Sequence, residues 1–403
     1  LMHYRNMSDA LQELLNRGVA EIYPTKEHLE KELESGRKLR LYFGIDPTAE
    51  SLHIGHAIGL RKMRQFQELG HEVILLIGSF TAMIGDPTDK TATRVQLSQT
   101  EVLKNAAGYK KQIGSILPLK GKNAAKIMFN HKWLSKLSFQ DVLELASNFT
   151  VQQMVERDMF ERRLKEGKPI YVHEFMYPLM QGYDSVDMDV DLEIGGSDQM
   201  FNMLAGRTLM KKMKDKEKFV MTFKLLENDE GKKMSKSEGG FIALSDTPED
   251  MYGKVMSMDD SMIFPYFELA TDVSMDEVNG MKIQIKEGVN PRDIKARLAH
   301  SVVSLYIGEK EAEKAQNYFD SVFRNQELPT DMETITVLKK TDLVTLLTES
   351  GLASSKSEAR RLLTQGAVKI DKVQVKDAEM EIIGTKEGVV LQRGKRQFVK
   401  LVK

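Results

Sequence analysis

The sequence contains no cysteine, and this absence excludes several kinds of chemistry at once. None of its 403 residues can form a disulfide, a thiolate zinc site or a cysteine nucleophile. Long apolar runs are also missing, because the longest, residues 73–80, is far too short to cross a membrane. We therefore expect a cytoplasmic protein that is neither exported nor inserted into a membrane.

A strong net charge is lacking too. The formal charge is −1, so no overall field steers the chain toward nucleic acid. The distribution is uneven, however, because residues 342–403 carry 12 Lys and Arg against 8 Asp and Glu. With 41% hydrophobic residues the chain can bury a large core, and its length predicts two to four domains, of which the last is basic.

The first half of the sequence alternates between strand and helix patterns. Residues 40–45 and 73–78 are apolar strand candidates, and residues 56–69 between them have the spacing of an amphipathic helix. A further strand and turn are predicted at residues 192–196. A continuously apolar strand is typical of a parallel sheet covered by helices on both faces. Ligands bind such sheets at the carboxyl ends of the strands, where residues 42–56 and 78–86 would both lie.

The whole chain is thus predicted to be an α/β protein with additional helical and C-terminal domains. Its expected parts are a Rossmann-like parallel-sheet domain over residues 1–230 with a helical insertion at about 99–168, a mobile loop over 231–247, a helical domain over 248–324, a linker over 325–341, and a small terminal domain over 342–403. Within the terminal domain, residues 368–375 are predicted to form one strand.

A short histidine motif stands at the expected start of the first long helix. His53, Gly55 and His56 would offer backbone N–H groups, the positive end of the helix dipole and two imidazole donors to phosphate oxygens. Gly55 carries no side chain, so a nucleotide could approach the backbone there. Capping and packing would explain both histidines equally well if the motif stood alone.

A second motif lies 180 residues further on, in a polar stretch flanked by glycines. Lys233 and Lys236 could close over a triphosphate and stabilise the charge that builds on leaving pyrophosphate. Lys90 and Arg94 follow a Gly-Asp-Pro turn and could serve the same purpose, although all four could also be ordinary surface charges. Together, the histidine and lysine motifs predict an ATP site that activates a carboxylate.

The complete set of motifs resembles the bacterial tyrosyl-tRNA synthetases, which are class I aminoacyl-tRNA synthetases. The similarity covers nearly the whole chain, and its strongest parts are residues 42–48, 53–56, 84–87, 177–184, 194–199 and 233–237. The resemblance implies a tyrosine–tRNA ligase that uses ATP with Mg²⁺, acts on L-tyrosine and tRNA(Tyr), and forms a homodimer through residues 99–168. It also implies that the terminal domain is an S4-like RNA-binding module.

The resemblance further implies a role for each matching position. Tyr42 and Asp184 would bind the phenolic hydroxyl of tyrosine, and the other tyrosine-site residues would be Asp86, Tyr177, Gln181 and Gln199. The ATP site would comprise Gly44, Asp46, Thr48, Gly55, Gly196, Asp198, Ser235 and Lys236. The catalytic groups around the phosphates would be His53, His56, Lys90, Arg94, Lys233 and Lys236, and RNA would contact Lys356, Arg360 and Arg361. No protein metal site is expected.

One position departs from the family pattern. Many members carry a threonine or another polar residue where this chain has Gly59, so a nucleotide contact is not implied there. Two other functions remain open at this point. A tryptophanyl enzyme would share the histidine and lysine motifs without the Tyr42 and Asp184 pair, and a structural RNA-binding protein would keep the scaffold without activity.

Overall fold

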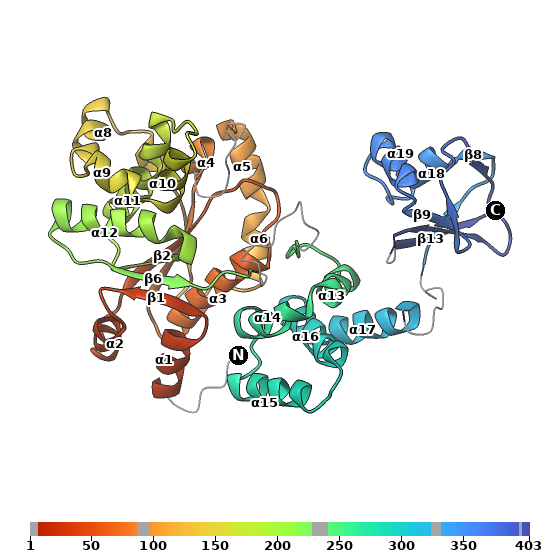
Figure 1. Cartoon of the computed structure of the whole chain (residues 1–403), viewed down its shortest axis with the longest axis horizontal. Coiled ribbons are helices and arrows are strands. Elements are labelled where there is room, and N and C mark those ends of the chain that lie inside the picture. Colours follow the sequence, from red (N-terminus) through yellow and green to blue (C-terminus); the bar gives the residue numbers. More distant parts are fainter. Residues whose placement is uncertain (1–6, 87–96, 228–240, 324–331, 395–396) are drawn as a thin grey trace. The chain divides into compact units, whose positions relative to one another are not determined.

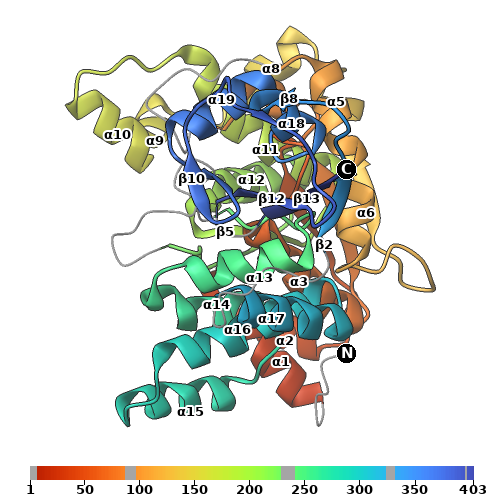
Figure 2. The same cartoon turned by 90° about the vertical axis from the view of Figure 1, so that its right-hand side faces the viewer.

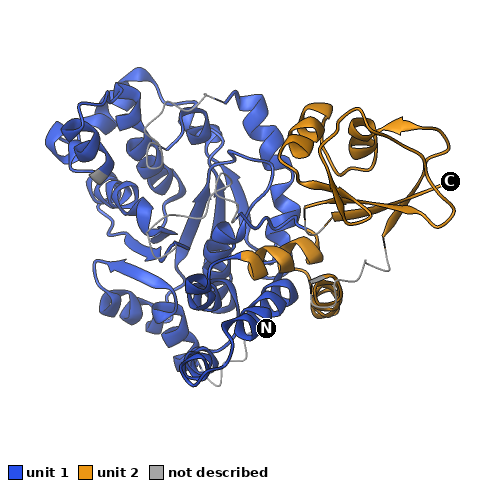
Figure 3. Ribbon diagram, turned by 45° about the vertical axis from the view of Figure 1, so that its right-hand side comes forward, with its two compact units in different colours: residues 1–246, 258–306 blue, residues 247–257, 307–403 orange. Residues whose placement is uncertain are grey.

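The computed structural model of the protein describes residues 7–86, 97–227, 241–323, 332–394 and 397–403. It divides into two compact units (Figure 3). Unit 1 contains residues 1–246 and 258–306, and unit 2 contains residues 247–257 and 307–403.

Unit 1 is built on a six-stranded sheet with the order β1-β6-β5-β2-β3-β4. Only β1 runs antiparallel, to its neighbour β6, and the remaining pairs are parallel. The strands are β1 (Val19–Tyr23), β2 (Arg40–Ile45), β3 (Glu72–Ile77), β4 (Lys126–Phe129), β5 (Leu192–Gly196) and β6 (Phe219–Phe223).

Helices surround this sheet on both sides (Figure 1). The helices up to residue 165 are α1 (Met7–Asn16), α2 (Lys26–Glu34), α3 (Ile54–Glu68), α4 (Thr81–Ile84), α5 (Gln99–Ala107), α6 (Tyr109–Gly114), α7 (His131–Leu134), α8 (Phe139–Ala146), α9 (Val151–Val155) and α10 (Asp158–Lys165). Those that follow are η2 (Val172–Phe175), α11 (Met176–Met188), η3 (Ser197–Gln199), α12 (Met200–Lys214), η5 (Asp260–Met262), α14 (Ile263–Ala270), α15 (Met275–Lys286) and α16 (Pro291–Tyr306).

The alternation of side chains along β2 places α3 and α11 on opposite faces of the sheet. Tyr42 reaches Ser185 of α11, whereas the next residue, Phe43, packs against Gly59 of α3. Neighbouring residues of a strand point to opposite faces, so the unit has three layers. The predicted strands at 40–45, 73–78 and 192–196 and the helix at 56–69 are confirmed to within two residues.

The segment 99–168, expected to be a helical insertion, also supplies a strand. Residues 126–129 form β4, which pairs in parallel with β3 from Ile74↔Lys126 to Ile77↔Phe129 and closes one edge of the sheet. The strand is only four residues long and is half-buried, so its sequence lacks the continuous apolar run that marks β3. A strand of this kind is held in place by its partner more than by its own residues.

The helices predicted as one domain over 248–324 are divided between the two units. Helices α14, α15 and α16, neighbours in Figure 2, belong to unit 1. Arg17 and Arg61 explain this, because their guanidinium groups donate to carbonyl oxygens at the end of α14, including those of Phe267, Leu269 and Thr271. Cationic donors at a helix C-terminus satisfy its unpaired carbonyls and oppose its dipole.

Unit 2 begins with a pair of helices, α13 (Pro248–Ser257) and α17 (Glu309–Phe323). They pack through the rings of Tyr252 and Phe319, whose centroids are 5.4 Å apart. The rest of the unit consists of β7 (Glu333–Thr336), β8 (Thr341–Asp342), α18 (Leu343–Glu349), α19 (Lys356–Thr364), β9 (Val368–Ile370), β10 (Val373–Val375), β11 (Glu381–Ile382), β12 (Val389–Arg393) and β13 (Gln397–Val402).

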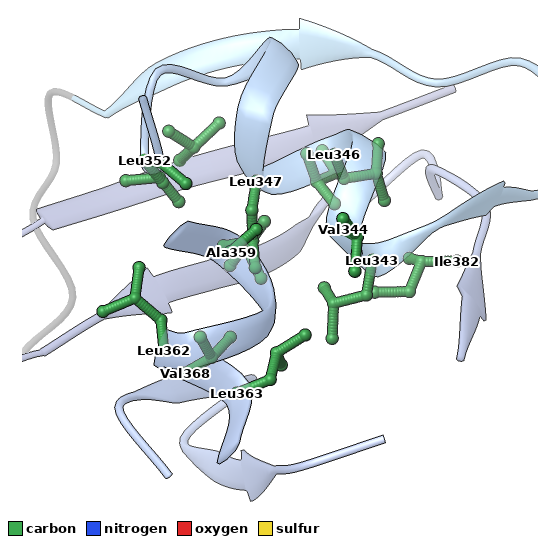
Figure 4. Packing of buried hydrophobic residues seen from close by; sticks show 14 of the residues in the cluster. Leu343, Val344, Leu346, Leu347, Leu352, Ala359, Leu362, Leu363, Val368 and Ile382 are labelled. Carbon is green, nitrogen blue, oxygen red and sulfur yellow. The ribbon is translucent and has the colours of Figure 1, made fainter. Parts of the chain in front are cut away.

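The terminal module of unit 2 packs α18 and α19 onto a five-stranded sheet with the order β10-β9-β12-β13-β7. Buried leucine, valine, alanine and isoleucine side chains form its core (Figure 4). Strand β7 lies in the segment 325–341 that was expected to be a linker, and it pairs in parallel with β13. Residues 368–375, expected as one strand, form a hairpin instead, because Asp371 and Lys372 turn with positive φ.

No helix in the described part of the chain is long and apolar enough to span a membrane.

The departure at Gly59 has a packing cause. A Cβ at this position would lie 2.5 Å from the ring of Phe43, which is 6% exposed and meets Phe223 edge-on. The helix can therefore approach the sheet this closely only without a side chain at residue 59. Gly280 in α15 offers a contrast, because a Cβ there would meet nothing within 4 Å.

We predict opposite effects of alanine at these two helical glycines. Gly59→Ala should lower the free energy of unfolding by about 1–3 kcal/mol through overpacking. Gly280→Ala should raise it by about 1 kcal/mol, because alanine favours the helix. Urea unfolding of both variants measures the difference, and a stabilised Gly59→Ala protein would contradict this account of the α3 packing.

Candidate active site

A cleft of about 700 Å³ opens in unit 1 at the carboxyl ends of β2, β3 and β5. This is the edge where open parallel sheets bind ligands. Its wall contains every predicted tyrosine- and ATP-site residue in the described part of unit 1: Tyr42, Gly44, Asp46, Thr48, His53, Gly55, His56, Asp86, Tyr177, Gln181, Asp184, Gly196, Asp198 and Gln199. Lys90, Arg94, Lys233, Ser235 and Lys236 lie outside the described residues.

One end of the cleft holds a buried hydroxyl and a buried carboxyl group. Tyr42 is 1% exposed and Asp184 2%. Trp133 Nε1 donates to Asp184 Oδ1 at 2.8 Å, and Asn130 Nδ2 donates to Oδ2 at 3.2 Å. Both carboxyl oxygens are thus fixed by N–H donors, and their remaining lone pairs are left for a further donor.

Burial controls the protonation of this pair. It raises the pKa of the Asp184 carboxyl well above its usual range, while the Trp133 and Asn130 donors oppose the rise by favouring the charged form. Burial also raises the pKa of the Tyr42 hydroxyl well above its usual value, so Tyr42 stays neutral. A ligand hydroxyl is the group best suited to lie against both side chains.

The other predicted tyrosine-site residues meet at the cleft, and each already contacts a protein group. Asp86 accepts from Arg157 Nη2 at 2.9 Å and from Gln199 Nε2 at 2.8 Å. The Tyr177 hydroxyl donates to Asp46 Oδ2 at 2.9 Å. The carboxylates of Asp46 and Asp86 are therefore held by neighbouring donors and give this part of the cleft an acidic wall.

The two histidines of the first motif form the cap of α3. His53 Nδ1 accepts from the backbone N–H of Gly55 at 3.1 Å, and His56 Nδ1 accepts from that of His53 at 3.2 Å. In the neutral form, each ring must therefore carry its hydrogen on Nε2. Burial, with His53 close by, lowers the pKa of His56 well below its ordinary value, so His56 is a neutral donor at physiological pH.

Capping and phosphate binding are thus compatible roles for these rings, because they use different nitrogens. Gly55 makes the arrangement possible, since a Cβ there would lie 2.8 Å from Cε1 of His53. From the sequence we expected Gly55 to let a nucleotide approach the backbone closely. In the structure, the imidazole of His53 needs the same space.

The last part of the predicted loop, residues 242–244, is attached directly to the histidine motif. Ile54 N donates to Ile242 O at 3.1 Å, and Leu244 N donates to Leu52 O at 2.8 Å. His53 and Ala243 form an antiparallel bridge between these stretches. Residues 242–244, which follow the lysine motif in the sequence, are consequently held at the start of α3.

Several residues of the site were not found from the sequence. Trp133, Asn130 and Arg157 come from the segment 99–168, where they touch Asp184 and Asp86. Glu193 and Lys218 form a buried ion pair behind the cleft. The one signal available was that Trp133 is the chain's single tryptophan, which alone does not point to a pocket.

The described residues contain no group of three His, Cys, Asp or Glu side chains placed to hold a metal ion.

Comparisons with known proteins first identify the class of protein to which the chain belongs. A family model described as tRNA synthetases class I (W and Y) matches residues 34–324, and one for the SYY-like C-terminal domain of tyrosine–tRNA ligases matches residues 325–401. The chain is 46% identical to the tyrosine–tRNA ligase of Carboxydothermus hydrogenoformans over 402 residues, which is 97% of each protein. It is 44% identical to that of Thermotoga maritima over 390 residues, 96% of each. The chain belongs to the tyrosine–tRNA ligase family of the class I tRNA synthetases.

Solved structures share the fold. A C-terminally truncated mitochondrial tyrosyl-tRNA synthetase from Coccidioides posadasii has a TM-score of 0.61 at 25% identity, covering 76% of this chain and 91% of that one. The tyrosyl-tRNA synthetase of Archaeoglobus fulgidus, complexed with L-tyrosine, has a TM-score of 0.61 at 24% identity, covering 77% of this chain and 99% of that one.

The capping role of His56 can be tested by substitution. His56→Ala should lower the free energy of unfolding by about 1 kcal/mol, because it removes the acceptor for His53 N–H. His56→Asn places a carbonyl oxygen near the Nδ1 position and should stay close to wild type. Equal losses in both variants, measured by urea unfolding at pH 7, would contradict the capping role.

The pH dependence of stability has a defined sign. Because the folded-state pKa of His56 is lowered, its contribution is present above pH 6.5 and is lost as the pH falls and the unfolded state binds a proton. His56→Asn should therefore gain stability relative to wild type between pH 7 and pH 5.

Proposed function

We propose that this protein is a tyrosine–tRNA ligase acting in protein synthesis in the cytoplasm. It activates L-tyrosine with ATP to tyrosyl-adenylate and diphosphate, and then transfers the tyrosyl group to the 3′-terminal adenosine of tRNA(Tyr). Family membership supports the reaction. The observation that favours tyrosine is the buried pair of Tyr42 and Asp184, because a tryptophan substrate would bring no hydroxyl group to them.

The cleft offers a contact for each part of tyrosine. The phenolic hydroxyl would lie between Tyr42 and Asp184, and the ammonium group at the acidic wall near Asp86, Tyr177, Gln181 and Gln199. Phenylalanine would leave the buried polar groups unpaired, an effect for which tyrosyl-tRNA synthetases are a standard example.

ATP would occupy the side of the cleft formed by Gly44, Asp46, Thr48, Gly55, Gly196 and Asp198. The tyrosine carboxylate attacks the α-phosphorus in line, and diphosphate leaves. No protein nucleophile is needed, because the attacking carboxylate is ionised at neutral pH. Catalysis then consists of positioning the two substrates and stabilising the charge that develops on the phosphate oxygens.

The Nε2–H groups of His53 and His56 are suited to this stabilisation. We assign Lys90, Arg94, Lys233, Ser235 and Lys236 to the same phosphates, supported by the anchoring of residues 242–244 beside His53. Mg²⁺ would accompany ATP as part of the substrate, held by phosphate oxygens and water.

Two variants test the phosphate roles. His56→Asn and Lys236→Ala should slow tyrosine-dependent ATP–pyrophosphate exchange by about 100-fold, because the first leaves no donor at the Nε2 position and the second removes the ammonium group. The dissociation constant for tyrosine should stay unchanged in equilibrium dialysis. His28→Asn, at an exposed position in α2, is the control. Exchange at the wild-type rate in either variant would refute its assignment.

RNA binding is assigned to an S4-like terminal module. Lys356, Arg360 and Arg361 are exposed on α19, which Ser355 caps by accepting from Glu358 N at 3.2 Å. Basic side chains on one helix suit contacts with RNA phosphates, which weaken as salt displaces them.

Neutralising this helix tests the assignment in the full chain. Replacing all three residues by glutamine should raise the KM for tRNA and reduce the slope of log KM against log salt by about 2. Adenylate formation should be unaffected. An unchanged salt slope would show that α19 does not contact the tRNA.

A homodimer would cover an exposed apolar surface on α8 and α9. Phe139 is 78% exposed, Leu143 55% and Val151 71%. All three lie in the segment 99–168 to which the dimer interface was assigned, and contiguous exposed apolar surface is typical of protein interfaces.

The double variant Phe139→Asp/Leu143→Asp should therefore sediment as a monomer, because two buried carboxylates would oppose association. Ile283→Asp, at a residue 56% exposed on α15, is the matched control and should remain a dimer. A double variant that sediments like wild type would place the interface elsewhere.

A further inference from the structure

A buried ion pair lies directly behind the hydroxyl end of the cleft. Lys218, just before β6, is 0% exposed, and its ammonium group contacts the carboxylate of Glu193 in β5, which is 2% exposed. Glu193 is the register partner of Tyr42 across the neighbouring strands. Glu193 and Tyr42 reach the cleft wall, whereas Lys218 does not.

The helices leave a space for this ammonium group. A Cβ at Gly206 of α12 would lie 2.5 Å from Lys218 Nζ and 3.0 Å from Ser185 Oγ. Any larger residue at position 206 would push the ammonium group away from α11. A buried ion pair is weak evidence for a role in stability, because the cost of removing both charges from water offsets their attraction.

The hydrogen bonds from Lys218 have a defined direction. Lysine can only donate, so Ser185 Oγ accepts from Lys218 Nζ at 2.9 Å. The Tyr42 hydroxyl donates to Gln181 O at 3.4 Å, which uses its only hydrogen. Ser185 Oγ lies 3.2 Å from Tyr42 Oη and 3.4 Å from Glu193 Oε2, to which Lys218 already donates. We assign the single hydrogen of Ser185 to the shorter contact, so that Ser185 donates to Tyr42.

The same pair also fixes Gln181. Its Nε2 donates to Glu193 Oε1 at 3.0 Å, while Glu193 Oε2 receives Lys218. Gln181 and Ser185 lie one helical turn apart on α11, so both contacts orient the same face of that helix. Two cleft residues, Tyr42 and Gln181, are thus held by Ser185 and by the Lys218–Glu193 pair.

We propose that Lys218, acting through Ser185, is a positioning residue that makes Tyr42 the hydrogen donor to the phenolic oxygen of the substrate. The inference rests on the proposed function. The phenol has one hydrogen, which it donates to Asp184, so its oxygen can accept from Tyr42. Tyr42 can turn its hydrogen from the long contact with Gln181 O to the substrate, because Ser185 continues to donate to its oxygen.

The chain therefore runs from Lys218 through Ser185 and Tyr42 to the substrate and ends at Asp184. Each hydroxyl in it donates once and accepts once. A positive charge at the start polarises every later bond, which strengthens the contact with the phenol. Phenylalanine gains nothing from this arrangement, so Lys218 contributes to the choice between the two amino acids without contacting either.

Ser185→Ala is the most direct test, because it breaks the chain and leaves the ion pair in place. In tyrosine-dependent ATP–pyrophosphate exchange, KM for tyrosine should rise about tenfold, in line with the loss of one buried hydrogen bond. The KM for ATP and the kcat/KM for phenylalanine should not change. The ratio of kcat/KM for tyrosine to that for phenylalanine should fall by the same factor.

A second variant removes the charge without leaving an unpaired carboxylate. Lys218→Met/Glu193→Gln retains an acceptor for Gln181 and should reproduce the tenfold loss. Adding Ser185→Ala to it should cause no further loss, because both changes interrupt one chain. Lys216→Met, two residues away and outside the chain, is the matched control.

The outcomes distinguish the proposed function of the protein from the positioning role of Lys218. A wild-type protein without tyrosine-dependent exchange would overturn the proposed function itself. In another outcome, the wild-type protein discriminates between tyrosine and phenylalanine while the variants show only a lower melting temperature. If their KM for tyrosine and their ratio of kcat/KM for tyrosine to that for phenylalanine are unchanged, the positioning role is overturned and only a structural role is left. Losses that add in the triple variant would also refute a single chain.

Discussion

The close crossing of α11 and α12 is the constraint on which the Tyr42–Asp184 end of the cleft depends. A Cβ at Gly182 would lie 2.9 Å from Leu209 and 3.1 Å from the backbone of Gly206. Two glycines therefore let the helices meet at their backbones, and this fixes the height of α11 above the sheet. Tyr177, Gln181 and Asp184 lie on the face of α11 that lines the cleft, so their positions depend on that contact.

The two ends of the cleft are built differently. The hydroxyl end is enclosed, and each polar group in it is fixed by a buried partner, as Asp184 is by Trp133 and Asn130. The end around the histidine motif is formed by a helix start and by a segment joined to it through backbone hydrogen bonds, as at Ile54 and Ile242.

Local sequence patterns predicted much of the fold. Strands β2, β3 and β5 and helix α3 were located because their apolar runs and helical periodicity are determined by residues close in the chain. Strands β4 and β7 were missed, because each is four residues long and owes its conformation to a partner strand. The hairpin at Asp371 and Lys372 was missed because its turn lacks the usual glycine or asparagine.

The candidate site was also predicted only in part. Every predicted tyrosine- and ATP-site residue that the structure describes in unit 1 lines the cleft. The supporting residues Trp133, Arg157, Glu193 and Lys218 were beyond prediction. Each is defined by a contact across a large sequence separation, such as the 71 positions between Asp86 and Arg157.

Trp133 gives the protein a property that none of its catalytic groups provides. It is the only indole in 403 residues, it is 7% exposed, and its Nε1–H lies on the carboxyl group at the bottom of the cleft. The tryptophan emission of the whole chain therefore originates from one point, and its colour and intensity depend on the charge and polarity at Asp184. The molecule contains its own optical probe of that carboxyl group, which can be observed without a label.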